Sequence, residues 1–441
     1  MATSANLLQA VATYQKSALG RLVNMYCFIS ETNKKFKDFQ NITANLGSTI
    51  TFDKPPRAYA NPGLVVTTFD TVEQPVESLK VGGYDSSGNP QVDGAYDIYG
   101  NLNAANTNLA VSGQQLIFNI DNNDYRKPLE EAHMTELGSK IESSVAANII
   151  PGTYRFYSPG LALDNTPLPI NSYEQVAAAL TKFRNYGAVP TDTKAFLSDF
   201  AQSDIVGSGL NKFVLDRNEK AANSWEVGSY DRSDFYASNL LPIHQAGTVC
   251  DNQDLLTVTS VTTDADGGIS AITCSGATTD TLLRGDLVYF VDGVTGQANG
   301  RYLTFTGHSV SANPIQMQVT ANATGVAGNI TFSIYPKLYS APGKNQNVNR
   351  PITAGMQIKG VPTHRAGLIC SGNPLYLAMP QLPDQDPFAT ANTADKLSGA
   401  SIRFTQGAAF GQNVTGFIFD SIWGVKFVSE YCLRLIFPLS Q

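Results

Sequence analysis

The apolar residues of this chain form one long helical pattern and many short β-like runs. Between residues 128 and 150 (PLEEAHMTELGSKIESSVAANII), apolar positions recur every three or four residues, which places them on one stripe of a helix. Pro128 suits the first helical position, where its missing N–H does no harm, and Ile150-Pro151-Gly152 is a stop signal. Such a helix, about 23 residues at about 1.5 Å each, is roughly 35 Å long. The predicted stripe consists of Met134, Leu137, Ile141, Val145 and Ile149.

A second, shorter helix is predicted for Ser172–Tyr186. Ser172 is its N-cap, Gln175 completes a capping box, and Gly187 is a natural C-cap. The pattern then predicts a strand at Lys194–Ser198 and a short helical segment that ends near Gly207. The predicted buried face of the second helix consists of Val176, Leu180 and Phe183.

A block of short β runs extends from about Ala246 to Lys337. The runs are separated by turn residues, and Asp266-Gly267 between two of them is a strong hairpin signal. We expect a small antiparallel barrel or sandwich, inserted into a larger domain. The six runs are Leu255–Val261, Ile269–Cys274, Leu287–Val291, Tyr302–Phe305, Ile315–Thr320 and Ile330–Tyr335.

The segments near the two ends of the chain differ from this block in composition. The closing run Phe417–Pro438 is apolar and β-prone, as a buried strand pair would be. Near the other end, Tyr84–Gly113 is dense in Gly, Asn, Asp and Ser. So long a loop is unusual in a compact domain, and we interpret it as a projecting hairpin that rests on another chain. Further strand-like runs are Ser48–Phe52, Leu64–Thr68 and Gln115–Phe118.

Residues 1–40 are predicted to form a helical arm, and this arm is basic although the protein as a whole is acidic. Five lysines and arginines against Glu31 and Asp38 give the arm a charge of 5 − 2 = +3. The arm is either a solvated face or a docking arm for an acidic partner or a neighbouring subunit. The five basic residues are Lys16, Arg21, Lys34, Lys35 and Lys37.

Composition narrows the class of protein. A chain of 441 residues suggests roughly three domains. Only 15% of the residues are charged, against about a quarter in an average protein, which favours a surface covered by neighbours. The formal charge of −7 argues against a general nucleic-acid binder. We find no signal peptide and no run long enough to span a membrane, so we expect a soluble protein that stays in the cytoplasm of the cell that makes it.

No motif in the sequence predicts catalysis, a cofactor or a metal site. His133, His244, His308 and His364 lie far apart in the sequence, without a neighbouring ligand at metal spacing. Asp264-Ala-Asp266-Gly lacks the acidic residue that ends a calcium loop, and a turn is the simpler interpretation. Arg284-Gly-Asp286 matches a cell-adhesion tripeptide, but Gly285 suits a turn before a strand. The five scattered cysteines are expected to be buried free thiols: Cys27, Cys250, Cys274, Cys370 and Cys432.

Three stretches in the second half of the chain carry a family resemblance. The first, Leu283–Tyr335, contains GDLVYFVDGV, then MQVTA, and closes on ITFSIYP. The second is Gly367–Pro383, and the third is Ser401–Pro438. Together they resemble major capsid proteins of tailed bacteriophages with the HK97 fold, specifically P22-type coat proteins with an extra β-barrel domain. Where that family has an aromatic–His pair, this chain has Ile369–Cys370. The matching positions of the third stretch are Asp420, Gly424, Val425, Glu430, Tyr431, Arg434 and Leu435.

The resemblance implies an α+β fold of the HK97-like type, with an inserted all-β domain. Its arm and extended loop match by position only. The long helix would be the spine of the peripheral (P) domain, beside an axial (A) domain. The implied division is an N-terminal arm at 1–40, an extended loop at 41–120, the P domain with spine helix at 121–186, A domain parts at 187–245 and 338–405, the inserted β-barrel domain at 246–337, a P domain strand at 406–421 and a C-terminal A domain part at 422–441.

The resemblance also implies a function. The chain would be a structural protein, not an enzyme, that assembles as hexamers and pentamers into an icosahedral phage head around double-stranded DNA, which it contacts without sequence specificity. Scaffolding protein and portal would be partners during assembly and procapsid maturation, and a decoration protein is a further possible partner. Assembly would take place in the bacterial host cytoplasm, and the final location would be the virion. Because the arm is basic here, the family's contact between basic scaffold and acidic arm is not transferred, and no motif makes Lys80 in the extended loop a crosslinker.

Two alternatives stay open at this stage. One is a host-encoded nanocompartment shell protein with the HK97 fold, although the inserted domain and long loop favour the virus. The other is a phage tail or receptor-binding β-protein, which would show repeated β modules, and no internal repeat is found.

Overall fold

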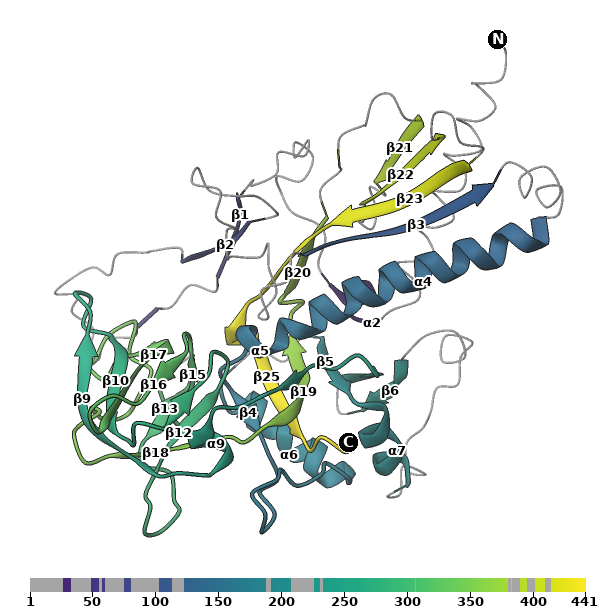
Figure 1. Cartoon of the computed structure of the whole chain (residues 1–441). Helices are drawn as coiled ribbons and strands as arrows, with labels where there is room; N and C mark the ends of the chain where they lie inside the picture. The colour runs from purple at the N-terminus through teal and green to yellow at the C-terminus, as the bar shows by residue number, and fades with distance from the viewer. Residues whose placement is uncertain are drawn as a thin grey trace.

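The computed structural model places a long helix, two sheets and a barrel in an elongated arrangement (Figure 1). It describes residues 27–32, 49–54, 58–59, 75–80, 103–112, 123–187, 192–207, 226–230, 233–305, 307–379, 382, 389–394, 401–408 and 414–441. The predicted runs at 64–68 and 115–118 lie outside these residues.

The long predicted helix is α4, Asn123–Ala147, followed by the short α5, Ile149–Gly152. It begins five residues before Pro128, so the prediction that Pro128 is the first helical residue is wrong. A break at Asn148, which was not predicted, separates α5 from α4, and α5 ends at Gly152, within the predicted stop signal Ile150-Pro151-Gly152. The apolar stripe is confirmed, because Met134, Leu137, Ile141, Val145 and Ile149 are all at most 2% exposed.

A four-stranded antiparallel sheet lies along α4, in the order β21-β22-β23-β3 (Figure 1). β3 pairs along its whole length with β23, which joins residues about 300 positions apart in the sequence, such as Asn106 and Asp420. Tyr84–Gly113 is therefore not a projecting loop throughout, since residues 104–112 are a paired strand of the chain's own sheet. The strands are β3, Ala104–Ser112; β21, Ala389–Ala394; β22, Ser401–Ala408; and β23, Val414–Ile422.

A seven-stranded mixed sheet forms the centre of the molecule, in the order β4-β25-β19-β5-β7-β6, with β8 also paired to β19. β25 pairs parallel with β4, β5 pairs parallel with β7, and the other pairs are antiparallel. The strands are β4, Phe156–Tyr157; β5, Thr193–Leu197; β6, Glu226–Tyr230; β7, Ser233–Ala237; β8, Ile243–His244; β19, His364–Ser371; and β25, Cys432–Phe437.

Two predicted helices lie beside this sheet. The second predicted helix is α6, Tyr173–Arg184, with Ser172 as its N-cap. Ser172 Oγ accepts from the Gln175 amide at 3.4 Å, while the Gln175 side chain accepts from the Asn171 amide at 2.9 Å, one residue earlier than a standard capping box. The predicted segment after β5 is α7, Asp199–Gly207. As predicted, Val176, Leu180 and Phe183 are buried, and Gly187 has a positive φ of 77°.

The β-rich block folds into a closed six-stranded barrel, in the order β10-β17-β15-β12-β18-β9. Five of its strands come from the predicted runs, and Asp266-Gly267 forms the turn between β9 and β10. The sixth strand, β18, lies 20 residues beyond residue 337, where the predicted inserted domain ends. The strands are β9, Leu256–Thr263; β10, Ile269–Ser275; β12, Leu287–Val291; β15, Gln316–Val319; β17, Asn329–Leu338; and β18, Gln357–Gly360.

Short elements fill the spaces between these units. The predicted run at Tyr302–Phe305 contributes β13, which pairs with β14 beside the barrel. The predicted run at 48–52 is β1, which pairs with β2. The remaining elements are α2, Cys27–Glu31; β1, Thr49–Asp53; β2, Val76–Lys80; α9, Thr248–Asp251; β11, Thr281–Leu282; β13, Arg301–Leu303; β14, Val310–Pro314; β16, Ala323–Thr324; β20, Leu375–Ala378; β24, Gly424–Phe427; and η3, Ser429–Tyr431.

The closing run at 417–438 is not a strand pair. It contributes to three strands that lie in three sheets: β23 pairs with β22 and β3, β24 pairs with β20, and β25 joins the seven-stranded sheet. The run therefore connects the units of the fold to one another. The predicted α+β class is confirmed.

Candidate functional site

Among the polar contacts that join parts of the fold within the described residues, four contain buried or mostly buried charged side chains, and these are the strongest candidates for functional residues. None of the residues involved forms a group of three or more His, Cys, Asp or Glu that could hold a metal ion, within the part of the chain that the structure describes.

The first contact ties the N-terminal arm to the long helix. Glu142 of α4 is 1% exposed, and its carboxylate accepts from the amides of Phe28 at 2.8 Å and Ile29 at 2.9 Å. These amides open α2, where backbone N–H groups lack helical partners. The Cys27 thiol donates to the same carboxylate at 3.3 Å, and burial, followed by the charge of Glu142, raises the pKa of this thiol. We call this contact the arm latch.

Two further contacts hold the arm latch against the central sheet. The ring of Phe28 stacks on Phe196 of β5 at a centroid distance of 4.2 Å. Lys194 of β5 forms an ion pair with Glu31 at 2.6 Å. The arm is thus fixed at residues 27–32 to both the helix and the sheet. The rest of the predicted arm lies outside the described residues.

The second contact joins the β1–β2 pair to the barrel and to η3. Lys54, just after β1, pairs with Glu77 of β2 and donates to the Tyr335 hydroxyl of the barrel at 3.2 Å. Tyr335 in turn donates to Glu430 at 3.1 Å. Burial opposes the charge of Glu77, but the hydrogen bond from Lys54 and the charges of Lys54 and Lys426 outweigh it and lower its pKa.

Lys80 gives no functional signal. It is the last residue of β2, and its side chain lies outside the described residues. A crosslinking role for it is therefore untested.

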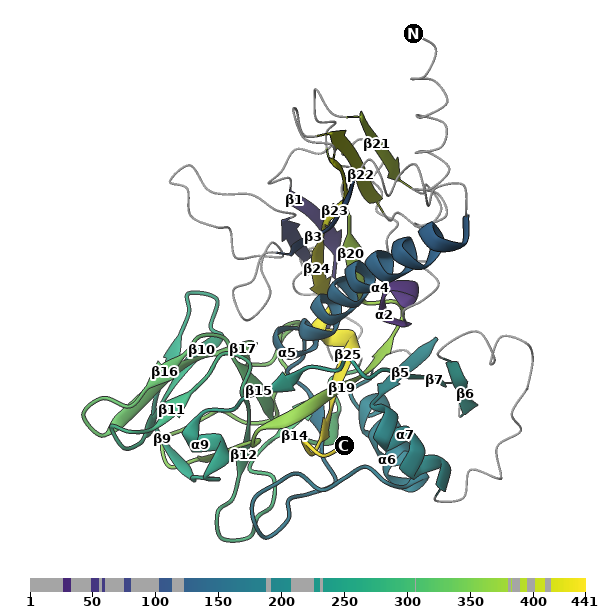
Figure 2. The same ribbon diagram turned by 45° about the vertical axis from the view of Figure 1, so that its right-hand side comes forward.

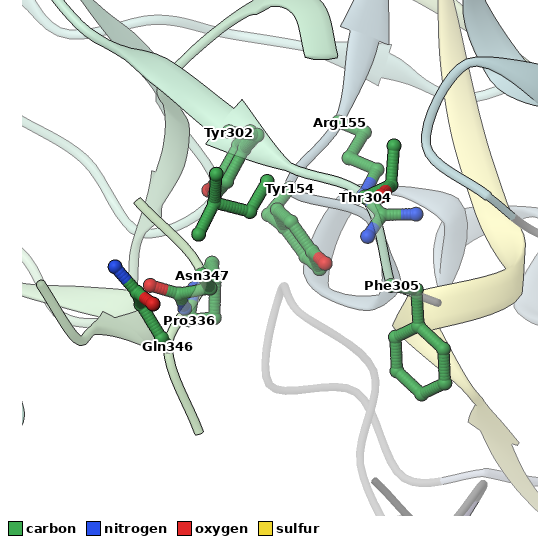
Figure 3. Close-up of a pocket in the computed structure, with 9 residues that line it drawn as sticks. Tyr154, Arg155, Tyr302, Thr304, Phe305, Pro336, Gln346 and Asn347 are labelled. Carbon is green, nitrogen blue, oxygen red and sulfur yellow. The ribbon is translucent and has the colours of Figure 1, made fainter. Parts of the chain in front are cut away.

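The third contact lies at a pocket between the barrel and the segment after α5 (Figure 3). Arg155 is 6% exposed, donates to the Glu430 carbonyl at 2.9 Å and lies 4.2 Å from the ring centroid of Tyr186. Its Nε is buried and has no hydrogen-bond partner among the described residues. The pocket is lined by Tyr154, Arg155, Tyr302, Leu303, Thr304, Phe305, Pro336, Gln346 and Asn347.

The fourth contact, which we call the junction cluster, consists of His244, Asp286, His364 and Arg434. Sequence analysis treated the histidines as scattered, but the structure brings two of them together, with ring centroids of His244 and His364 5.5 Å apart. His244 Nε2 lies 2.7 Å from Asp286 Oδ1, and Arg434 Nη1 lies 3.5 Å from His364 Nε2. The pairing of β8 with β19 explains the meeting, because it sets His244 opposite His364.

The junction cluster also excludes the cell-adhesion interpretation of Arg284-Gly-Asp286. The Asp286 side chain is fully buried, so the tripeptide cannot present it to an adhesion receptor. Gly285 has a φ of 98° and forms the predicted turn.

Asp264 and Asp266 serve the β9–β10 turn, as predicted. Lys337 of β17 pairs with Asp264 at 2.6 Å and with Asp266 at 3.1 Å, and Asp266 accepts from the Gly268 amide at 3.1 Å.

The four-stranded sheet has its own charged pair. Arg403 of β22 and Asp420 of β23 are opposite each other in the register and form a two-point contact, with Arg403 Nε donating to Asp420 Oδ1 at 3.0 Å. The five cysteines are free and buried, as predicted.

Sequence reasoning found some of these residues and missed others. The resemblance pointed to Asp420, Glu430 and Arg434, but it did not predict which contacts they make. Glu142 was missed, although a carboxylate directly after Ile141 of the apolar stripe was a usable signal. His133 and His308 do not join a cluster among the described residues: Tyr59 packs edge-on against His308 at 5.3 Å.

Comparisons with known proteins give structural similarity alone. No family model and no curated protein matches the sequence. "Mycobacterium phage Che8" has 7% identity and a TM-score of 0.40, covering 93% of this chain and 90% of that one. "Capsid of Ralstonia phage GP4" has 6% identity and a TM-score of 0.40, covering 93% and 88%. "Crystal structure of virus-like particle from Pyrococcus furiosus" has 7% identity and a TM-score of 0.35, covering 95% and 96%.

These TM-scores are all below 0.5, so the similarity decides neither the detailed fold nor the function. No helix among the described residues is long and apolar enough to cross a membrane.

Proposed function

We propose that this chain is the major capsid protein of a tailed bacteriophage, assembling as hexamers and pentamers into an icosahedral head. The observation that carries the proposal is the arrangement of α4 and the four-stranded sheet. They extend together to one side of the central sheet, while the barrel lies on the other side (Figures 1 and 2). The apolar side chains of this unit join the common core of the chain, and its open sheet would gain further burial when neighbouring copies pack on it.

The proposed division of labour follows the described units. α4 with the four-stranded sheet would be the P domain, the seven-stranded sheet the A domain and the barrel the inserted domain. This differs from the bounds that the resemblance implies: β3 moves from the extended loop, and β21 with most of β22 from the A domain, to the P domain, while β4 moves to the A domain. The arm latch supports this division, because it fixes the arm at one point on α4 and on β5. The arm and the extended loop would then contact neighbouring copies, and the low charged fraction of 15% suits surfaces that become covered.

A shell of many copies needs no strong pairwise contact, because weak contacts add through multivalency. The charge of −7 suits a container for double-stranded DNA, since a strongly basic lumen would bind the DNA backbone. Scaffolding protein, portal and a decoration protein are proposed as further partners, the virion as the location and the bacterial cytoplasm as the place of assembly.

Electron microscopy of the purified protein tests this function. The protein is expressed alone and together with its neighbouring genes. Closed shells of several hundred subunits support a phage capsid. Small shells of uniform size, formed without other genes, would favour a nanocompartment. A soluble trimer that binds glycans would contradict both shell functions.

A further inference from the structure

The junction cluster lies where the chain leaves the central sheet for the barrel and where it returns. His244 ends β8 and His364 begins β19, and the two residues are paired in the sheet register. Every covalent link between the central sheet and the barrel runs through residues 245–255 and 361–363. The orientation of the barrel therefore depends in part on what holds these two segments, beside the contacts of Tyr335 and of Gln316 with the rest of the chain.

Asp286 attaches the barrel to the outgoing segment. Its carboxylate accepts from His244 Nε2 at 2.7 Å, from the Gly247 amide at 3.1 Å and from the Leu283 amide at 2.7 Å. His244 belongs to the sheet, Gly247 to the outgoing segment and Leu283 to the barrel. One fully buried carboxylate thus joins all three.

Arg434 attaches the same barrel loop to the end of the long helix. From β25, its guanidinium donates to the Gly285 carbonyl at 3.2 Å and to Thr153 Oγ1 at 2.9 Å, and it also donates to the Ile150 carbonyl. It is fully buried. The cation therefore touches the barrel, the segment after α5 and, through His364, the returning strand.

His364 is placed so that a proton would disturb this arrangement. Its Nδ1 lies 2.7 Å from the Pro362 carbonyl, which can only accept, so Nδ1 carries the hydrogen. In the neutral ring Nε2 then presents a lone pair toward Arg434 Nη1 at 3.5 Å. Protonation would turn Nε2 into a donor facing a donor and would set two positive charges side by side.

We propose that the junction cluster is an acid-sensitive joint, in which protonation of His364 separates it from Arg434 and loosens the attachment of the barrel's two connecting segments to the central sheet. The residues act as positioning residues for the barrel. The inference does not depend on whether the chain forms shells.

The direction of the effect follows from linkage. Burial, followed by the charge of Arg434, lowers the pKa of His364 well below its usual range. Above the ordinary pKa of about 6.5, His364 is neutral in both the closed and the open joint. Below it, the open joint takes up a proton and the closed joint does not, so closure is weakened by up to about tenfold per pH unit.

The other titratable groups around the cluster do not remove this effect. Burial also lowers the pKa of His244, against the opposing hydrogen bond with Asp286. Burial raises the pKa of the Cys250 thiol, and the charge of Asp286 adds to this. The Asp251 carboxylate accepts a hydrogen bond from the Thr363 amide at 2.7 Å.

Hydrogen exchange of the full chain, measured by mass spectrometry across pH and corrected for intrinsic rates, tests the joint. Peptides covering residues 245–249 and 282–286 report on the amides of Gly247 and Leu283. We expect their protection to fall about tenfold between pH 6.5 and 5.5. Peptides within β12 and β15 should keep their protection, because the barrel itself stays closed.

The variant His364→Asn keeps a donor for the Pro362 carbonyl but cannot titrate in this range. Because the pKa of His244 is also lowered by burial, we expect some loss of protection at residues 245–249 and 282–286 to remain between pH 6.5 and 5.5, but clearly less than in the natural protein. His133→Gln, which removes a partly exposed histidine outside the cluster, serves as the matched control and should behave like the natural protein.

Two outcomes would overturn the proposal. One is natural protein whose junction peptides keep full protection down to pH 5.5, a result that needs no variant to fold. The other is a loss of protection in His364→Asn between pH 6.5 and 5.5 that is as large as in the natural protein.

Discussion

The barrel and the unit formed by α4 with the four-stranded sheet differ in whether they leave sheet edges unpaired. The barrel closes on itself, so each of its six strands has two neighbours. The four-stranded sheet is open, with β21 at one edge and β3 at the other, and α4 lies beside β3. A closed barrel is complete within one chain, whereas an open sheet with a long helix is suited to extension by neighbours.

The charged contact at the barrel's hairpin turn also differs in burial from the charged contacts of the helix and sheet unit. The described charges of the barrel's hairpin turn, such as Lys337 with Asp264, are well exposed, at 41% and 37%. In the helix and sheet unit, Glu142 is buried at the arm latch, and Arg403 and Asp420 are mostly buried. Removing one partner of a buried polar contact leaves the other without water, so we expect the larger effects in the helix and sheet unit.

The largest effect is predicted for Ile141→Asp in the apolar stripe. Ile141 is fully buried, and a carboxylate there should destabilise the α4 unit by about 4 kcal/mol or more and abolish assembly-competent folding. The soluble yield and thermal unfolding of the variant measure the effect. Lys140→Asp, at the exposed adjacent position of α4, is the control and should fold normally. Soluble, shell-forming Ile141→Asp protein would show that the stripe is not buried.

A smaller, local effect is predicted for Glu142→Gln. The amide keeps one acceptor but turns an NH₂ donor toward groups that are themselves donors, which should weaken the arm latch by about 1–3 kcal/mol. Hydrogen exchange should increase at residues 27–32 while α4 itself stays protected. Glu136→Gln, at an exposed position of the same helix, provides the comparison. Equal exchange at the latch in the two variants would mean that Glu142 does not hold the arm.

The same contrast explains how far sequence analysis could go. The barrel strands were predicted closely, because alternation and the Asp266-Gly267 turn act between residues near in sequence. The pairing of β3 with β23 was not predicted, since it joins Asn106 to Asp420 across about 300 residues. β18 was missed for a similar reason: it closes the barrel by pairing with β9 and β12, far from either in sequence.

The polar contacts were hardest to predict, because each joins distant segments through side chains. Glu142 meets residues more than 110 positions away, and His244 meets His364 only because β8 pairs with β19. The resemblance pointed to Glu430 and Arg434 as positions without giving their contacts.

A moderate effect is predicted for the Arg403–Asp420 pair of the open sheet. The side chains are 10% and 18% exposed, and their two-point contact links β22 to β23. A double-mutant cycle with Arg403→Gln and Asp420→Asn should give a coupling energy of about 1–2 kcal/mol in chemical denaturation. A coupling energy near zero would show that this sheet does not depend on its charged pair.

The smallest effect is predicted for Lys337→Met on the barrel, the matched test of a charged contact that is open to solvent. The hydrogen bond from Lys337, followed by that from Ser270, lowers the pKa of Asp264, so any stabilisation is present at neutral pH and is lost as the pH falls below the ordinary Asp value of about 4. Exposed ion pairs contribute little because water screens them. We therefore expect no measurable change in the thermal unfolding midpoint at neutral pH. A fall in the unfolding midpoint as large as that caused by Arg403→Gln would mean that the barrel depends on its surface charges as much as the open sheet depends on its buried ones. The two units would then differ in topology alone.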